Sequence, residues 1–224
     1  MNPSTISLHQ LAAAHTEFQK VEPRDLFYRV AIELIDLSLQ EKTKITVPEA
    51  LAVLLQTWNK AFYRFHKFDA DHFSKIEKLV DANLSLLLQF GKRSIDGFEE
   101  NDEPVIEELF RDFEQVLGPV GAAKSMHLLA PRFFPLWDRA IAKAYGIPLK
   151  EIGMNAARYV QFMVKTKEQV EQLGGETAVG GNPLKAIDEF NYCTYTLPKE
   201  NRISDKAAEK RRNASPQIPQ SLNP

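Results

Sequence analysis

Two charged residues, Lys124 and Asp138, flank the most hydrophobic stretch of the chain, GPVGAAKSMHLLAPRFFPLWDRAIA (118–142). A lysine amine is a nucleophile once it is deprotonated, and a carboxylate can stabilise positive charge or activate water. Both residues also have structural interpretations. A surface lysine is tolerated at this position, and Asp138 is placed to cap a helix over 138–146, a bond worth about 1 kcal/mol. We take the two residues as a candidate catalytic pair and keep these alternatives open.

Glycines before Lys124 predict a tight turn between two helices. One helix is predicted to end at Leu117 and the next to begin near Ala122. Gly118 and Gly121 permit backbone conformations that other residues resist. The N–H groups of such a turn, beside a helix N-terminus, suit a phosphate. Lys124 would then occupy the first helical turn, where the helix dipole disfavours a cation, and this exception makes it a candidate site residue.

Residues 101–145 resemble the helix–hairpin–helix DNA glycosylases. The shared pattern is a helix, a glycine turn, a second helix with an early lysine, and a loop ending in P-x-x-D before another helix. This chain has LGPVG where the family has Leu-Pro-Gly-Val-Gly, and its lysine follows the turn by three residues instead of two. The resemblance implies an all-α fold, double-stranded DNA as the partner, and base-excision activity on damaged DNA.

The resemblance also assigns roles by position. Asp138 would be the carboxylate that supports cleavage of the glycosidic bond, and Lys124 the amine nucleophile found in bifunctional members. The DNA-binding residues would be Gly118, Val120, Gly121 and Lys124, to which we add Arg139 because it lies in a locally basic stretch.

Aromatic residues and a histidine near these positions are candidates for the wall of a base-binding pocket. They are His127, Phe134, Trp137, Trp58 and Tyr63. His127 follows Lys124 by three residues and so shares its helix face. The alternative interpretation of His127 is a buried histidine whose hydrogen bonds are satisfied within the core.

The segment TWNKAFYRFHKFDADH mixes aromatic with basic side chains. On a continuous helix Trp58 and Phe65 would face the core, while Lys60 and Arg64 would lie on another face. Aromatic side chains beside cations suit base stacking and phosphate contact. The alternative is an amphipathic helix with one solvated side.

Apolar residues recur every three or four positions along most of the chain, which predicts helices. The predicted helices begin after Pro23 and Pro48 or cover residues 73–88, 105–117, 121–130, 138–146, 155–173 and 183–195. In the last of these, Asp188 and Glu189 are predicted to face away from the core. The only β-branched run is TKITV (43–47). We therefore predict one all-α domain over 1–197, with roughly eight to nine helices, and a disordered tail over 198–224.

Composition and charge exclude several classes of protein. The net charge of −2 and the pI near 6.2 argue against non-specific coating of nucleic acid or membrane. A single cysteine, Cys193, excludes a disulfide framework within the chain and a four-cysteine metal centre. No apolar run approaches the roughly 20 residues of a membrane span, and the N-terminus lacks the pattern of a secretory signal. We expect a cytoplasmic protein without membrane contact, metal or cofactor.

Two functions stay open on the residues alone. The first is a DNA-binding protein of the helix–hairpin–helix glycosylase type that acts on damaged bases. The second is a non-catalytic all-α module that binds nucleic acid or a protein partner. Neither interpretation specifies an oligomeric state. The two are separated by whether Lys124 and Asp138 meet at one cleft that is wide enough for a base, with the amides of the glycine turn facing outward. If the two side chains lie on opposite faces, the catalytic interpretation fails.

Overall fold

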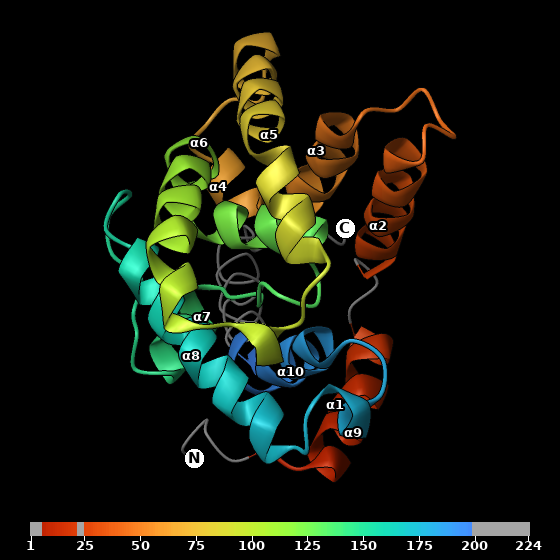
Figure 1. Ribbon diagram of the computed structural model, residues 1–224, viewed down its shortest axis with the longest axis vertical. Helices are drawn as coiled ribbons and strands as arrows, with labels where there is room; N and C mark the ends of the chain where they lie inside the picture. The colour runs from red at the N-terminus through yellow and green to blue at the C-terminus, as the bar shows by residue number, and fades with distance from the viewer. Residues whose placement is uncertain (1–5, 22–24, 199–224) are drawn as a thin grey trace, which may run out of the picture.

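The computed structural model describes residues 6–21 and 25–198, and this part of the chain is all-helical, as predicted (Figure 1). Its α-helices are α1 (Leu8–Val21), α2 (Asp25–Leu39), α3 (Val47–Trp58), α4 (Lys60–Tyr63), α5 (Ala70–Gly91), α6 (Glu103–Leu129), α7 (Arg139–Ala144), α8 (Ala156–Gln172), α9 (Glu176–Val179) and α10 (Pro183–Asn191). Short 3₁₀ turns cover Ile95–Gly97 and Glu100–Asp102, and a π-helical turn covers Tyr192–Thr196. The tail predicted to be disordered falls almost wholly on residues 199–224, outside the described part.

The β-branched run 43–47 forms no strand because its end starts a helix. Thr46 is the N-cap of α3: its hydroxyl accepts a hydrogen bond from the backbone N–H of Glu49. The Glu49 carboxylate accepts in turn from the backbone N–H of Thr46, which completes a capping box, and Pro48 lies in the first helical turn. These local hydrogen bonds satisfy backbone groups that a strand would have left for a partner.

Helix α6 contains a sharp break at Gly118 (φ 70°, ψ 169°). This region of backbone conformation is open essentially to glycine alone. The helix resumes at Pro119, earlier than the predicted Ala122, because proline suits the first position of a helix. The two parts of α6 run in clearly different directions (Figure 1). The break is one residue long, and the helix–hairpin–helix element is not confirmed.

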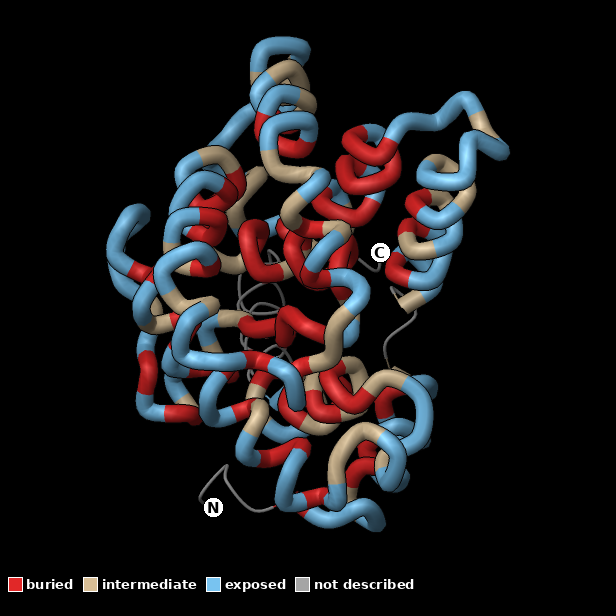
Figure 2. Tube along the Cα trace, viewed as in Figure 1, coloured by how far each residue is buried: buried red, intermediate tan, exposed pale blue. Residues whose placement is uncertain are grey.

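The second part of α6 is the centre of the core. Every residue from 121 to 130 is buried except Lys124, and buried stretches of several helices gather in the middle of the molecule (Figure 2). Beside it, Phe110 stacks on Tyr159 with ring centroids 4.5 Å apart, and Trp137 meets both rings edge-on. The Trp137 indole N–H donates to the Pro119 carbonyl at 3.0 Å, which ties this aromatic cluster to the break in α6.

The helices pack in pairs that bring distant segments together. Helix α1 packs on α10, α2 packs on α3, and α6 packs on both α5 and α8. Helices α1, α9 and α10 lie at the lower end of the molecule in Figure 1, below the central part of α6. The N-terminal and C-terminal helices therefore meet next to the segment 118–142.

Candidate functional site

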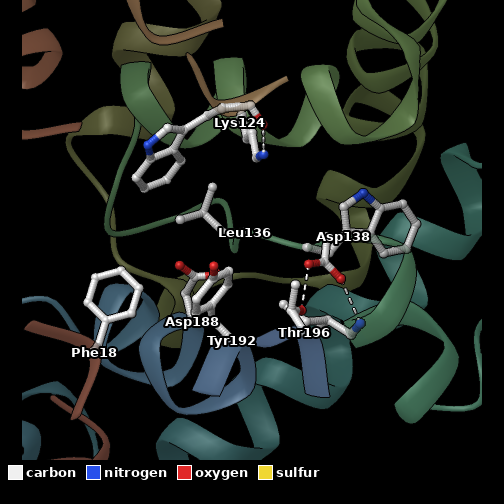
Figure 3. A pocket seen from close by; sticks show the side chains of 10 residues that line it. Phe18, Lys124, Leu136, Asp138, Asp188, Tyr192 and Thr196 are labelled. Atoms are coloured by element: carbon white, nitrogen blue, oxygen red, sulfur yellow. Dashed lines mark hydrogen bonds between the residues drawn. The ribbon is translucent and has the colours of Figure 1, made fainter. Parts of the chain in front are cut away.

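Lys124 and Asp138 meet at one pocket, which has a volume of about 100 Å³ (Figure 3). The pocket is lined by side chains from seven parts of the fold: Phe18, Trp58, Lys124, Leu136, Trp137, Asp138, Ile141, Asp188, Tyr192 and Thr196. Four of these ten residues are aromatic and three are charged. Two predicted pocket residues, Trp58 and Trp137, are among them. Lys124 and Asp138 therefore line one cleft, as the catalytic interpretation requires, but Gly118 and Gly121 of the glycine turn are buried and do not face outward.

Asp138 has its carboxylate held by three hydrogen bonds. As the N-cap of α7, its Oδ1 accepts from the backbone N–H groups of Ala140 and Ile141 at 2.7 and 2.8 Å. Its Oδ2 accepts from the Thr196 hydroxyl at 2.6 Å. The predicted capping role is confirmed, and the same bonds orient the carboxylate at the edge of the pocket.

Lys124 contacts the end of another helix. Its ammonium group donates a hydrogen bond to the backbone carbonyl of Trp58, the last residue of α3, and lies 5.6 Å from the centroid of the Trp58 ring. A cation at a helix C-terminus satisfies an unpaired carbonyl and complements the helix dipole. Lys124 is also beyond the first turn after the Gly118 break, so the dipole of α3, and not that of α6, accounts for this lysine.

Asp188 on α10 is a pocket residue that the sequence prediction placed on the wrong side. Its side chain is half-buried and its two oxygens point into the pocket (Figure 3). Removal from solvent raises the pKa of Asp188 to about 7, and the attraction of Lys185 only partly offsets this shift. No described residue donates a hydrogen bond to its carboxylate. Helical spacing contained the missed signal, because Asp188 follows the inward Leu184 by four residues.

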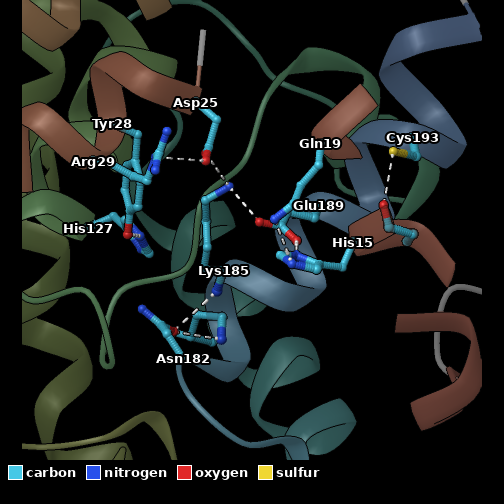
Figure 4. Close-up of polar contacts among 12 residues, drawn as sticks. His15, Gln19, Asp25, Tyr28, Arg29, His127, Asn182, Lys185, Glu189 and Cys193 are labelled. Carbon is cyan, nitrogen blue, oxygen red and sulfur yellow. Dashed lines mark hydrogen bonds and ion pairs between the residues drawn. The ribbon is translucent and has the colours of Figure 1, made fainter. Parts of the chain in front are cut away.

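A network of ion pairs surrounds Lys185, which precedes Asp188 by three residues on α10 (Figure 4). The Lys185 ammonium contacts the Asp25 carboxylate at 3.0 Å and the Glu189 carboxylate at 3.1 Å. Burial opposes the charged form, but the carboxylates of Asp188, Glu189 and Asp25 together raise the pKa of Lys185. Glu189 also pairs with His15 Nδ1 at 2.7 Å. Glu189 is 5% exposed, so the prediction that it faces away from the core is wrong as well.

Two other predicted pocket residues, His127 and Phe134, lie in the core instead. Both are fully buried, and the His127 Nδ1–H donates to the Phe134 carbonyl at 2.7 Å. The other ring nitrogen of His127 accepts from the Tyr28 hydroxyl at 2.9 Å. Burial lowers the pKa of His127 to about 4. The alternative interpretation of this residue, a buried histidine with satisfied hydrogen bonds, is the one the structure has.

Tyr63, the remaining candidate, does not line the pocket. Its hydroxyl contacts His72 Nε2 at 3.1 Å, and its ring packs edge-on against Phe62 and Phe68. Desolvation raises the pKa of Tyr63 to about 12. Tyr63 therefore belongs to an aromatic cluster between α4 and α5 and not to the pocket wall.

The glycines predicted to grip a phosphate are buried beneath other residues. A Cβ at Gly118 would lie 3.0 Å from the Phe62 ring, and one at Gly121 would lie 2.5 Å from Asn59 Nδ2. Asn59 donates through that nitrogen to the Leu117 carbonyl at 3.0 Å. Close packing accounts for both glycines. The DNA contacts assigned to these glycines, to half-buried Val120 and to exposed Arg139 stay predictions.

The residues that follow Trp58 form an exposed aromatic-basic segment (residues 60–68). Helix α3 ends at Trp58 and α4 covers only four residues, so Phe65 lies beyond a helix and is 87% exposed. Its predicted place in the core is wrong. Lys60 and Arg64 are exposed and form no ion pair with any described residue, and the segment contains no carboxylate. The first acid after it, Asp69, lies 3.7 Å from Lys67.

Within residues 6–21 and 25–198, no helix combines the length and the apolar character needed to cross a membrane. The same residues contain no cluster of three or more His, Cys, Asp or Glu side chains arranged to hold a metal ion. Comparison of the chain with protein-family models, with curated proteins and with solved structures gives no match. The functional argument therefore rests on the pocket and its surroundings.

Proposed function

We propose that this protein binds DNA and holds one unpaired base in the pocket between Lys124 and Asp138, in the manner of the helix–hairpin–helix glycosylases that its sequence resembles. The observation that carries the proposal is the meeting of these two residues at an aromatic-lined pocket. Its volume of about 100 Å³ is of the same order as an engineered cavity of about 150 Å³ that binds benzene. A pocket of this size suits a small flat ligand, and the sugar and phosphate of a nucleotide would lie outside it.

Aromatic residues around the pocket support a flat ligand. Phe18, Trp58 and Tyr192 come from three different elements and leave their ring faces or edges toward the same space. Stacking of a base on an aromatic side chain contributes about 1–3 kcal/mol and does not depend strongly on which base is bound. This gain offsets the few kcal/mol needed to move a base out of a duplex, least for a damaged or mismatched base.

The aromatic-basic segment is the surface we assign to the nucleic-acid backbone. It begins two residues after Trp58, which lines the pocket, so we propose that DNA bound on this segment also reaches the pocket. Lys60 and Arg64 would contact phosphates, and the exposed ring of Phe65 would stack on a base. This assignment replaces the glycine turn as the main anchor because Gly118 and Gly121 are covered by Phe62 and Asn59.

The chemistry assigned to the pocket is hydrolysis of the glycosidic bond. Water bonds to the sugar carbon C1′, the bond from C1′ to the base nitrogen breaks, and the base leaves with a proton. Asp138, fixed by its three hydrogen bonds, would stabilise the positive charge that develops at C1′. The Lys124 ammonium is engaged with the Trp58 carbonyl, which favours attack by water over attack by the lysine amine.

A binding experiment tests the proposal. Fluorescence anisotropy would compare a duplex carrying an abasic-site analogue with an undamaged duplex at two salt concentrations. We expect salt-sensitive binding that prefers the lesion and weakens at least tenfold in a Lys60→Glu/Arg64→Glu variant. A Lys42→Glu/Lys165→Glu variant carries the same change of net charge at exposed positions elsewhere and should bind as the wild type does. Absence of wild-type binding at low salt would overturn the proposal.

A non-catalytic base-binding module is the second candidate. It is favoured by the engagement of both charged residues: Lys124 with the Trp58 carbonyl, and both oxygens of Asp138 with donors. Single-turnover assays on duplexes with different damaged bases separate the two. Cleavage that is lost in Asp138→Asn, at unchanged DNA affinity, indicates the enzyme. Lesion binding without cleavage of any substrate indicates the module.

A further inference from the structure

We propose that Asp188 determines which ligand the pocket accepts, by binding a planar ring whose edge carries two adjacent N–H donors, as guanine does. The inference rests on the proposed function, since it takes the pocket to be a base-binding site. It concerns a residue outside the segment 118–142 and assigns to the pocket a chemical class of ligand.

The two pocket carboxylates differ in how much of their acceptor capacity is used. An ionised carboxylate has about four lone-pair sites. Asp138 uses three of them on two backbone amides and the Thr196 hydroxyl. Asp188 receives no hydrogen bond from any described residue, and its oxygens face the empty space of the pocket (Figure 3). A ligand therefore finds its free acceptors on Asp188.

The cations near Asp188 are engaged with other groups. On its own helix, Lys185 pairs with Glu189 and with Asp25 of α2. From α6, Lys124 donates to the Trp58 carbonyl.

The other described polar groups that face this region donate no hydrogen bond to Asp188 either. The Tyr28 hydroxyl of α2 is bonded to His127, and Asp138 adds a second negative charge across the pocket. A half-buried carboxylate without hydrogen bonds is costly, and a ligand that brings N–H donors removes that cost.

The geometry of a carboxylate selects the ligand edge. Its two oxygens accept two parallel N–H bonds from adjacent donors. Guanine offers N1–H and the 2-amino group side by side. Hypoxanthine keeps only N1–H, and adenine places a ring-nitrogen acceptor beside its amino group, so that the acceptor would face a carboxylate oxygen. The expected order of affinity is guanine, then hypoxanthine, then adenine.

The protonation state of Asp188 makes a second prediction, which is that ligand affinity depends on pH. Desolvation raises the pKa of this carboxyl to about 7, and two N–H donors require its ionised form. Affinity for the guanine edge should therefore increase between pH 6 and pH 8. A ligand held only by stacking on the aromatic walls would bind equally well at both values.

NMR titration of the full chain with deoxyguanosine, deoxyinosine and deoxyadenosine at pH 6 and pH 8 tests the inference. At pH 8 we expect deoxyguanosine to bind about tenfold more tightly than deoxyadenosine. Asp188→Asn should lose this preference and its pH dependence, because its amide N–H₂ would face the ligand's donors. Asp112→Asn changes an exposed aspartate on the first part of α6 and should retain both. An unchanged preference in Asp188→Asn would overturn the inference.

A ligand variant tests the wild-type protein alone, so the conclusion does not depend on whether Asp188→Asn folds. Methylation of N1 removes one donor, and 1-methylguanosine should bind about tenfold more weakly than guanosine. Equal affinities would overturn the inference. If no nucleoside binds while the lesion duplex does, the assignment of Asp188 fails and DNA binding stands. If nucleosides bind with the predicted order but the duplex does not, the assignment of Asp188 stands and the DNA-binding proposal fails.

Discussion

The two walls of the pocket are built in different ways. The wall from α6 and the loop before α7 is held by bonds to the backbone: Asp138 caps α7, Lys124 binds the Trp58 carbonyl, and Trp137 binds the Pro119 carbonyl. The opposite wall, from α1 and α10, depends on side-chain ion pairs around Lys185. Each bond of the first wall has one partner in the backbone, which carries no charge, whereas both partners of an ion pair respond to pH. We therefore expect the first wall to set the shape of the pocket and the second to set its electrostatics.

Removal of the charge at Lys185 should have the largest effect on stability. In Lys185→Met, Asp25, Glu189 and Asp188 lose their shared cation, and loss of one member of a buried ion pair costs about 4 kcal/mol. Urea unfolding measures the change. Arg29→Met removes a more exposed cation that lies 3.9 Å from the same Asp25, and it should cost less than about 1 kcal/mol. Equal effects of the two variants would mean that the α10 wall gains no particular stability from its ion pairs.

Asp188→Asn should stabilise the protein, and only above acidic pH. The pKa of Asp188 is raised from 3.8 to about 7 in the folded state, so its contribution to stability is full below pH 4 and is lost as the pH rises to 7. A shift of this size corresponds to about 4 kcal/mol, and we expect about 3 because the side chain is only half-buried. The asparagine variant keeps the shape of the side chain without the charge.

The measurement for Asp188→Asn is the difference in unfolding free energy between variant and wild type at pH 4, 6 and 8. His127, whose pKa is lowered to about 4, destabilises both proteins as the pH falls below 6.5, so its effect cancels in the difference. The difference should be near zero at pH 4 and should grow until about pH 7. A difference in unfolding free energy that does not change with pH would show that Asp188 is solvated like a surface carboxylate.

Gly118→Ala tests the break that shapes the other wall. Alanine at φ 70° and ψ 169° is strained, and its Cβ would meet the Phe62 ring at 3.0 Å, so we expect a loss of about 2 kcal/mol. Gly97→Ala is the matched control, because nothing lies within 4 Å of its Cβ and its backbone is not in the left-handed region. Thermal unfolding of the two variants gives the comparison. If the Gly118→Ala protein is as stable as the Gly97→Ala protein, the backbone conformation and the close contact described at Gly118 would be wrong.

Substitutions of Asp138 should have the smallest effect. Asp138→Ala removes the cap of α7 and should cost about 1 kcal/mol, whereas Asp138→Asn keeps a capping oxygen and should cost a few tenths, roughly. The same substitution at Asp138 and at Asp188 tests the proposed difference between the two walls. The same Asp-to-Asn change should be nearly neutral at one position and stabilising at the other when both are measured at pH 8. A stabilising effect at both positions would mean that both carboxylates are unsatisfied.

Local signals in the sequence predicted the parts of the site that depend on local structure. The capping role of Asp138 follows from its place before RAIAKAYG, and Asp69 caps α5 from the same kind of position. The all-α fold follows from the helical spacing of apolar residues. The start of the helix after Gly118 was predicted near Ala122 and lies at Pro119. The local signal that was missed is the proline directly after the break, which marks a first helical position.

The errors fall where contacts between distant segments decide the outcome. Phe65 was placed in the core because the aromatic residues from Trp58 onward have helical spacing. The helix ends at Trp58, where Asn59 bonds to a carbonyl 58 residues further along the chain, and no local pattern reports that bond. Asp188 enters the pocket because α10 packs on α1, a pairing of the first and last α-helices among the described residues. The aspartate in the predicted segment was found, and the aspartate opposite it was not.

The burial pattern of α6 has a consequence for mutational tolerance. From residue 121 to residue 130 only Lys124 reaches the surface of the molecule, so packing constrains every other side chain in this stretch. In a library screened for folding alone, nine of these ten positions should tolerate few substitutions, and Lys124 should tolerate many. In a library screened for ligand binding, Lys124 should tolerate few substitutions as well. The difference between the two screens at Lys124 would measure how far selection for function, as opposed to selection for a stable fold, retains this lysine.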